Sequence, residues 1–400
     1  MKPQLHRPAL PAAYAMAFAI SGSHAMAADS SVSSSGTAFN PAIGVILAGT
    51  YSVYKTNPDD YVLSGFPLME DALPVQQGLS LGETELSFSS NIDDQFYGAA
   101  VISFARDGGV EVEEAYLQTL SLPEGFIVKA GRFFSGIGYL NSVHSHAWDF
   151  VDQPLVYRAM LANQFGDDGV QLRWIAPTYL FVELGGEALR GDAYPAGGGA
   201  HKGVGTKTVF ANIGGDVGLS HSWRAGVSYM NAAAVDRETG DPGAPDAFTG
   251  TSKLGIVDAV WKWAPLGNPT IRNFKAQFEY FKRREDGAFT AGDGGVADAA
   301  YKADQSGWYL QGVYQFMPKW RVGLRYDALR ADEVDAVLAG TALDRAGHDP
   351  SRTSAMVDFS NSEFSRIRLQ YNRDDSGPHT DRQWYLQYLM SIGAHGAHQF

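Results

Sequence analysis

Apolar and polar residues alternate along much of this 400-residue chain, with the period of two that is typical of β-strands. The segment QWYLQYLMSIGAHGAHQF, from Gln383 to Phe400, shows the pattern clearly. Every second residue from Trp384 to Ile392 is apolar, whereas the positions between them are mostly polar or small. This alternation predicts a strand with one apolar face, and not a helix.

The same alternation predicts sixteen strands in total. They are Ile43–Tyr54, Leu79–Ser90, Phe96–Arg106, Glu111–Ser121, Phe126–Ile137, Gly169–Ala176, Tyr179–Arg190, Lys207–Leu219, Trp223–Ala234, Lys253–Ala264, Ile271–Arg284, Ser306–Phe316, Trp320–Ala331, Thr353–Phe359, Phe364–Arg373 and Gln383 onward. An even number of strands allows an up-and-down antiparallel arrangement that closes on itself.

The connections between these strands alternate in length. Short connections such as NIDDQ, LPEG, LSHS, MPK and SNSE are rich in turn-forming residues. Longer polar connections lie between them, among them GDAYPAGGGAHKGVGT, DRETGDPGAPDAFTGT and REDGAFTAGDGGVADAAYKADQ. Short turns at one end and long loops at the other are typical of outer-membrane barrels, in which the short turns face the periplasm. The predicted fold class is therefore all-β, a transmembrane up-and-down antiparallel barrel of about 16 strands.

The amino-terminal segment predicts export. Lys2 and Arg7 precede an apolar stretch, and the AMA at residues 25–27 has the small-x-small pattern that a signal peptidase cleaves. The alternative is a membrane anchor, but the apolar stretch is shorter than the roughly 20 residues that a spanning helix needs. We therefore expect a signal peptide at 1–27, a flexible Ser-rich segment at 28–40 and an outer-membrane barrel at 41–400.

Composition agrees with an exported β-protein. Loss of Lys2 and Arg7 with the leader lowers the formal net charge from −13 by two, to −15, which argues against nucleic acid as a partner. The chain contains no cysteine, which excludes a disulfide framework and thiolate chemistry. Aromatic residues lie beside the predicted short turns, where they would form a belt at the lipid interface: Phe126, Trp223, Trp263, Phe316, Trp320 and Phe400.

The leader, the alternating loops and the final strand ending at Phe400 together resemble the sixteen-stranded porins of Gram-negative outer membranes. The resemblance implies outer-membrane localisation, contact with outer-membrane lipid, a homotrimer, and recognition of the last strand by the β-barrel assembly machinery. VKAGRFFSGIG resembles phosphate-selective porins. SGIGYLNSVHSHAWDFVDQPLVYRAML and GAHGAHQF resemble poorly characterised proteobacterial outer-membrane proteins, some of which are labelled zinc-regulated receptors.

The connection Tyr139–Asp168 is too long for a structureless loop and carries many apolar residues that need burial. The resemblance to porins implies a constriction loop that folds into the lumen and brings Asp149, Asp152 and Arg158 to the narrowest point. The alternative is an extracellular cap packed on its neighbouring loops.

Residue parity places a set of charged side chains on the predicted lumen side of the strands. The cations are Arg173, Arg224, Lys275, Arg283, Arg321, Arg325, Arg366 and Arg368, and the acids are Glu183, Glu187, Asp258, Glu279 and Asp327. We expect Arg173, Lys275, Arg321, Arg325, Arg366 and Arg368 to line the pore and to select small polar or anionic solutes. The alternative is that the arginines only pair with neighbouring acids and fill the interior.

Two histidines suggest metal binding as a second possible function. His144 and His146 are two residues apart in the long loop, so that an extended backbone would place both rings on one face, compatible with Zn²⁺. The main prediction is a porin for passive diffusion, without a cofactor, and the alternative is a receptor or transport component for a metal ion such as zinc. An enzyme is not predicted, because no nucleophile-elbow pattern surrounds Ser142 or Ser145.

Overall fold

The computed structural model describes residues 41–82, 84–104, 109–197 and 203–393. The predicted signal peptide, the segment 28–40, the terminal Phe400 and the histidine-containing end of the last segment lie outside the described residues.

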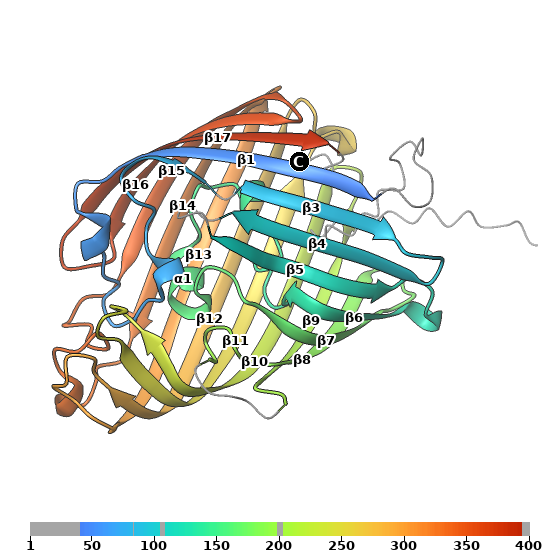
Figure 1. The fold of residues 1–400 in the computed structure, drawn as a ribbon. Helices are drawn as coiled ribbons and strands as arrows, with labels where there is room; N and C mark the ends of the chain where they lie inside the picture. Colours follow the sequence, from blue (N-terminus) through green and yellow to red (C-terminus); the bar gives the residue numbers. More distant parts are fainter. Residues whose placement is uncertain (1–40, 83, 105–108, 198–202, 394–400) are drawn as a thin grey trace, which may run out of the picture.

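The described chain forms one closed antiparallel barrel (Figure 1). The strands are β1 (Ala42–Val53), β2 (Gly78–Leu81), β3 (Thr84–Asn91), β4 (Phe96–Phe104), β5 (Val110–Thr119), β6 (Phe126–Phe134), β7 (Gly166–Ile175), β8 (Phe181–Leu189), β9 (Thr206–Val217), β10 (His221–Thr239), β11 (Asp246–Trp263), β12 (Asn273–Thr290), β13 (Ala299–Met317), β14 (Trp320–Ala331), β15 (Ser351–Ser362), β16 (Ser365–Asp375) and β17 (Asp381–Gly393). Apart from β2 and β3, which follow each other along β1, each strand pairs with the next, and β1 pairs with β17, which closes the barrel. Because β2 and β3 both pair with β1, they act as one interrupted strand, and the barrel has sixteen strand positions.

The alternation of residues separates two chemically different faces. On β17, Trp384, Leu386 and Tyr388 are between 38% and 49% exposed, whereas Gln383 and Tyr385, at positions of the opposite parity, are buried. In a water-soluble barrel the apolar face would be buried; here the apolar side chains point outward and the polar ones inward. This inversion is the pattern of a barrel with lipid outside.

The sixteen predicted strands are all confirmed, but several are longer than predicted, and β10 to β13 extend well into predicted loops. β10 continues to Thr239, β11 begins at Asp246, β12 continues to Thr290 and β13 begins at Ala299. The predicted long loops DRETGDPGAPDAFTGT and REDGAFTAGDGGVADAAYKADQ are therefore largely strand, and this part of the loop prediction is wrong. Glycine, proline and acidic residues hide the alternation there, and cross-strand pairing overrides their low strand propensity.

Helical structure is confined to short connections in the described ranges. The α-helix is α1 (Leu155–Leu161), and single 3₁₀ turns are η1 (Pro58–Asp60), η2 (Glu70–Ala72), η3 (Pro123–Gly125), η4 (Ser145–Ala147), η5 (Pro265–Gly267) and η6 (Ala336–Leu338). Among the residues that the structure describes, no helix has the length and apolar composition needed to cross a membrane.

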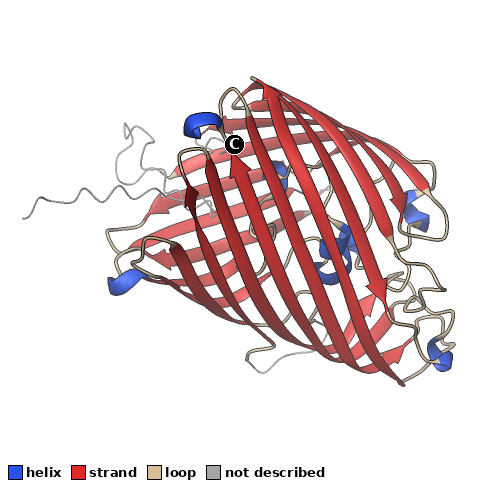
Figure 2. Cartoon of the chain, turned by 180° about the vertical axis from the view of Figure 1, so that it is seen from behind, coloured by secondary structure: helices blue, strands red, loops and turns tan. Residues whose placement is uncertain are grey.

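The connection between β6 and β7, residues 135–165, is named the inner loop. It includes η4 and α1, and α1 lies within the ring of strands (Figures 1 and 2). All seven residues of α1 are buried, and all except Arg158 share one apolar cluster with wall residues of β10 to β14. Because the strands end at Phe134 and begin again at Gly166, this loop starts four residues earlier than the predicted Tyr139 and ends three residues before Asp168.

A second connection, residues 54–77 between β1 and β2, packs on the same apolar cluster through Leu63, Phe66, Leu68 and Ala72. The sequence patterns predicted nothing for this segment. It joins the inner loop in filling the barrel interior.

Candidate functional site: the inner loop and the charged wall

The two ends of the inner loop are tied together. The Ser135 amide donates to the Phe165 carbonyl oxygen at 3.0 Å. Asn141 Nδ2 donates to the carbonyl oxygens of Ser135 and Phe165, each at 2.8 Å, and Asn141 Oδ1 accepts from the Phe165 amide at 2.7 Å. The loop therefore leaves and rejoins the wall at one place.

Glu279 of β12 holds the first part of the loop. Its carboxylate accepts from the Tyr139 and Leu140 amides at 2.9 and 3.1 Å and from the Tyr157 hydroxyl of α1 at 2.9 Å. Gly138 lies at φ +65°, and a Cβ there would come within 2.7 Å of Glu279 and 2.8 Å of the Tyr157 hydroxyl. Glycine is required here both for the left-handed backbone and for the close approach.

Asp149 connects the loop to one part of the basic wall. It forms ion pairs with Lys275 of β12 and with Arg321 of β14, the latter at 3.2 Å. Arg321 also pairs with Asp358 of β15 at 2.6 Å. Burial disfavours the Asp149 carboxylate, but Lys275 and Arg321 outweigh it, so that the pKa of Asp149 lies below its usual range.

Asp152 makes the second connection to the wall. It forms ion pairs of 2.8 Å with Arg325 of β14 and with Arg352 of β15. It also accepts hydrogen bonds from Gln370 and Asn372 of β16 at 2.8 and 2.9 Å. Burial again opposes ionisation, yet Arg352 and Arg325 hold the pKa of Asp152 below its usual range.

Two further arginines of β16 contact the loop through its backbone. Arg368 Nη2 donates to the Trp148 carbonyl oxygen at 2.8 Å, and Arg366 Nη2 donates to the His146 carbonyl oxygen at 2.6 Å. Arg368 also lies 3.5 Å from Asp358. No carboxylate of the described residues lies within ion-pair distance of Arg366, and its Nε is buried without a hydrogen bond. Arg366 is therefore the least compensated cation of this wall.

Arg158 and Arg173 lie elsewhere. Arg158 of α1 donates to the Ala72 carbonyl oxygen at 2.8 Å and stacks over the ring of Tyr61, so its direct contacts hold the segment 54–77. Arg173 of β7 pairs with Glu183 of β8 at 3.2 Å. The structure thus groups Asp149, Asp152, Lys275, Arg321, Arg325, Arg366 and Arg368, and leaves Arg158 and Arg173 outside that group.

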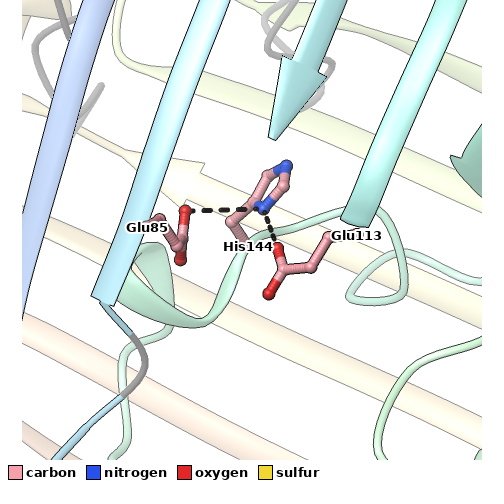
Figure 3. A group of neighbouring side chains, drawn as sticks. All are labelled: Glu85, Glu113 and His144. Carbon is pink, nitrogen blue, oxygen red and sulfur yellow. Dashed lines mark ion pairs between the residues drawn. The ribbon is translucent and has the colours of Figure 1, made fainter. Parts of the chain in front are cut away.

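The predicted metal residues meet acids on the opposite wall. His144 Nε2 lies 3.0 Å from Glu114 of β5, and His144 Nδ1 lies 3.4 Å from Glu113 of β5 and 3.7 Å from Glu85 of β3 (Figure 3). His146 Nδ1 lies 2.8 Å from Glu85. Burial lowers the pKa of His144, but the carboxylates of Glu113 and Glu114 outweigh it and raise that pKa well above its ordinary value.

Water reaches the inner wall unevenly. The inward-facing polar residues of β12 to β16 are almost all buried against the inner loop. Examples are Gln277, Glu279, Arg325, Asp327 and Arg352. Inward-facing Ser87, Ser89, Tyr116 and Lys129, on β3, β5 and β6, remain partly exposed. The solvent-accessible part of the interior therefore lies beside β3 to β6.

The sequence patterns missed several residues of the site. Arg352 lies one residue before the predicted start of its strand, although its parity with Ser354, Met356 and Asp358 was a usable signal. Glu113 and Glu114 are consecutive, so strict alternation allows only one of them to face inward. The pairing of β4 with β5 shifts register between Val101 and Ile102, and this bulge lets both acids reach His144.

Comparison with known proteins adds a relative and a set of similar folds. No protein-family model matches the chain. A protein of Aquifex aeolicus (strain VF5), described only as an uncharacterized protein, is 32% identical over 342 residues, which cover 81% of this chain and 71% of the relative. The chain belongs to the same family as that Aquifex protein. The two proteins are similar in sequence over most of the barrel, and the description of the Aquifex protein gives no activity.

Solved structures establish the fold class. A loop-deletion mutant of OmpT, an outer-membrane protein of Vibrio cholerae, matches with a TM-score of 0.55 and 10% identity, over 88% of this chain and 99% of that chain. An anion-selective porin from Comamonas acidovorans matches with a TM-score of 0.53 and 9% identity, over 88% and 99%. The outer-membrane channel DcaP of Acinetobacter baumannii matches with a TM-score of 0.50 and 14% identity, over 88% and 97%. The protein has the sixteen-stranded barrel fold of the Gram-negative outer-membrane porins.

Proposed function

We propose that this protein is an outer-membrane channel for the passive diffusion of small polar solutes, with a preference for anions, and that the inner loop sets its limiting cross-section. The observation that carries the proposal is the attachment of this loop to opposite walls. Asp149 and Asp152 bind the cations of β12 to β15, and His144 lies against Glu114 of β5. A segment held at both sides of a lumen must limit what passes through it.

The charge of the wall supports the preference for anions. The ion pairs form two networks. The first joins three cations and two acids, Lys275, Arg321 and Arg368 with Asp149 and Asp358. The second joins two cations and three acids, Arg325 and Arg352 with Asp152, Asp327 and Asp374. Arg366 lies beside the first network and adds one positive charge to its excess of cations. It is the second residue of β16, next to the short turn after β15, and therefore belongs to the end of the lumen expected to face the periplasm. The Comamonas porin is anion-selective, but at 9% identity the likeness concerns the fold, so the preference is inferred from Arg366.

The proposal includes the cellular setting. We expect the leader at 1–27 to direct export, the last strand to be recognised by the β-barrel assembly machinery, and the mature barrel to reside in the outer membrane. A trimer is also proposed; one structural neighbour, OmpT of Vibrio cholerae, is described in a trimer form. No enzymatic activity is proposed.

The test is the conductance of the purified protein in planar lipid bilayers. Because the Ser135 amide and the Phe165 carbonyl oxygen are 3.0 Å apart, residues 137–163 can be replaced by a short Gly/Ser turn without moving the strand ends. We expect this variant to conduct several-fold more than the unaltered protein. A matched control removes residues 292–296 from the loop between β12 and β13 and should leave the conductance unchanged.

Two results would contradict the proposal. If neither the unaltered protein nor the shortened-loop variant conducts ions, although both migrate as folded barrels before heating, the protein is not a diffusion channel. If both deletions change the conductance equally, the inner loop does not set the limiting cross-section.

A further inference from the structure

Three side chains from separate segments converge inside the barrel. Glu85 comes from β3, Glu113 from β5 and His144 from the inner loop, and their ligand atoms all lie within 4.8 Å of one another (Figure 3). The Nδ1 atom of His144 faces the gap between the two carboxylates, 3.4 Å from Glu113 Oε2 and 3.7 Å from Glu85 Oε2. This Nδ1 atom is buried and forms no hydrogen bond with the described residues, although the two carboxylates lie within ion-pair distance.

The separations match those between ligands of one metal ion. Zn²⁺ is bound by imidazole nitrogen and carboxylate oxygen at about 2.0–2.2 Å, so two ligands at a tetrahedral angle are about 3.3–3.5 Å apart. The distance from His144 Nδ1 to Glu113 falls in this range and the distance to Glu85 is slightly longer. Only small side-chain movements are needed to place all three atoms around one ion.

Neighbouring side chains orient two of the three ligands. Glu114 Oε2 lies 3.0 Å from His144 Nε2 and can accept a hydrogen bond from its N–H group. A metal ion at Nδ1 displaces the Nδ1 proton to solvent, and the freed lone pair is directed at Glu85 and Glu113. His146 Nδ1 lies 2.8 Å from Glu85 Oε1, the oxygen of Glu85 that does not face His144 Nδ1. A carboxylate on the far nitrogen of a metal-binding histidine is a common arrangement in metal sites.

We propose that Glu85, Glu113 and His144 bind a divalent transition-metal ion of the Zn²⁺ type, with one coordination position left for water. One imidazole and two carboxylates suit this class of ion, and the two carboxylates balance its charge. The ion would join the inner loop to β3 and β5, opposite the ion pairs of Asp149 and Asp152 with β12 to β15. It would therefore fix the loop at both walls.

The experiment measures metal bound to the full-length mature protein, folded in detergent and exposed to Zn²⁺ alone. We expect one Zn²⁺ per chain after dialysis, measured by elemental analysis, and an increased thermal unfolding temperature. Co²⁺ at the same site should give visible absorption bands of a low-coordination nitrogen–oxygen site. Glu113→Gln should weaken binding at least about tenfold, and Glu114→Gln, which disturbs only the orientation of His144, should weaken it less.

Glu111→Gln is the matched control, because Glu111 lies on the same strand but does not belong to the cluster. It should bind Zn²⁺ like the unaltered protein. If Glu113→Gln impairs folding, His144→Gln tests the same site from the loop side and should abolish the Co²⁺ bands. The proposal is overturned if the unaltered protein binds no Zn²⁺, or if Glu113→Gln and Glu111→Gln bind it equally; His144 would then serve only as an ion-pair partner of the acids.

Discussion

The carboxylate of Asp152 in the inner loop accepts a hydrogen bond of 2.8 Å from Nη1 of Arg352 in β15, 200 residues later in the chain. Arg352 is fully buried, and Asp152 is its nearest carboxylate. The loop therefore supplies the shortest of three carboxylate contacts to Arg352, the other two coming from Asp327 and Asp374 of the wall, and this contact holds the loop in place.

Asp152→Asn should weaken this attachment strongly. The substitution removes the shortest carboxylate contacts of Arg325 and Arg352 and leaves Asp327 and Asp374 as their remaining acidic partners, so we expect a loss of about 1.5–3 kcal/mol in unfolding free energy. Equilibrium unfolding in detergent measures the loss, and the single-channel current should become noisier as the loop moves. Asp332→Asn, at an exposed position in the loop after β14, is the control and should change neither quantity. Equal effects of the two substitutions would show that the ion pairs do not anchor the loop.

Arg366 and Arg325 should respond differently to the same substitution. Arg366→Gln removes a cation that has no carboxylate partner among the described residues, so the reversal potential under a KCl gradient should shift toward cations while the protein still assembles. Arg325→Gln breaks ion pairs with Asp152 and Asp327 and should reduce stability more than selectivity. The reverse pattern would mean that the selectivity does not depend on the uncompensated charge.

Acidification should leave the inner loop attached down to about pH 4. Asp149 and Asp152 have pKa values below their ordinary value of about 3.9, since burial is outweighed by Lys275 and Arg321 for the first and by Arg352 and Arg325 for the second. Their contribution to stability is therefore complete above the unfolded pKa and is lost only as the pH falls through the lower folded values. Single-channel conductance at pH 7 and at about pH 4 should show the same noise level. A loop released between these pH values would contradict the assignment.

Gly138→Ala should destabilise the start of the inner loop. The new Cβ would meet the Glu279 carboxylate and the Tyr157 hydroxyl, and the residue would remain in the left-handed conformation at φ +65°. We expect a loss of unfolding free energy of about 2–3 kcal/mol. Gly218→Ala is a matched control, because Gly218 has φ +64° and a Cβ added there would meet no atom within 4 Å, so this variant carries only the backbone strain. Equal losses in both variants would show that the close contact is unimportant.

The sequence by itself determined the barrel, because alternation with period two is a local property that any strand with one lipid-facing side must show. The inward orientation of Arg321, Arg325, Arg366 and Arg368 was predictable as well. Successive side chains of a strand point to opposite faces, so one lipid-facing residue determines the orientation of all the others on that strand. The ends of β10 to β13 were not predictable from these patterns, because partner strands extended the pairing through residues of low strand propensity.

Only the tertiary structure decided which charges meet. Asp152 and Arg352 are 200 residues apart, and no spacing rule connects them. Glu113 joins Glu114 at His144 because a bulge in β5 interrupts the alternation, and Glu85 arrives from a third segment. Strand patterns report which way a side chain points, whereas a site inside a barrel depends on which loop enters the lumen and how far it reaches across.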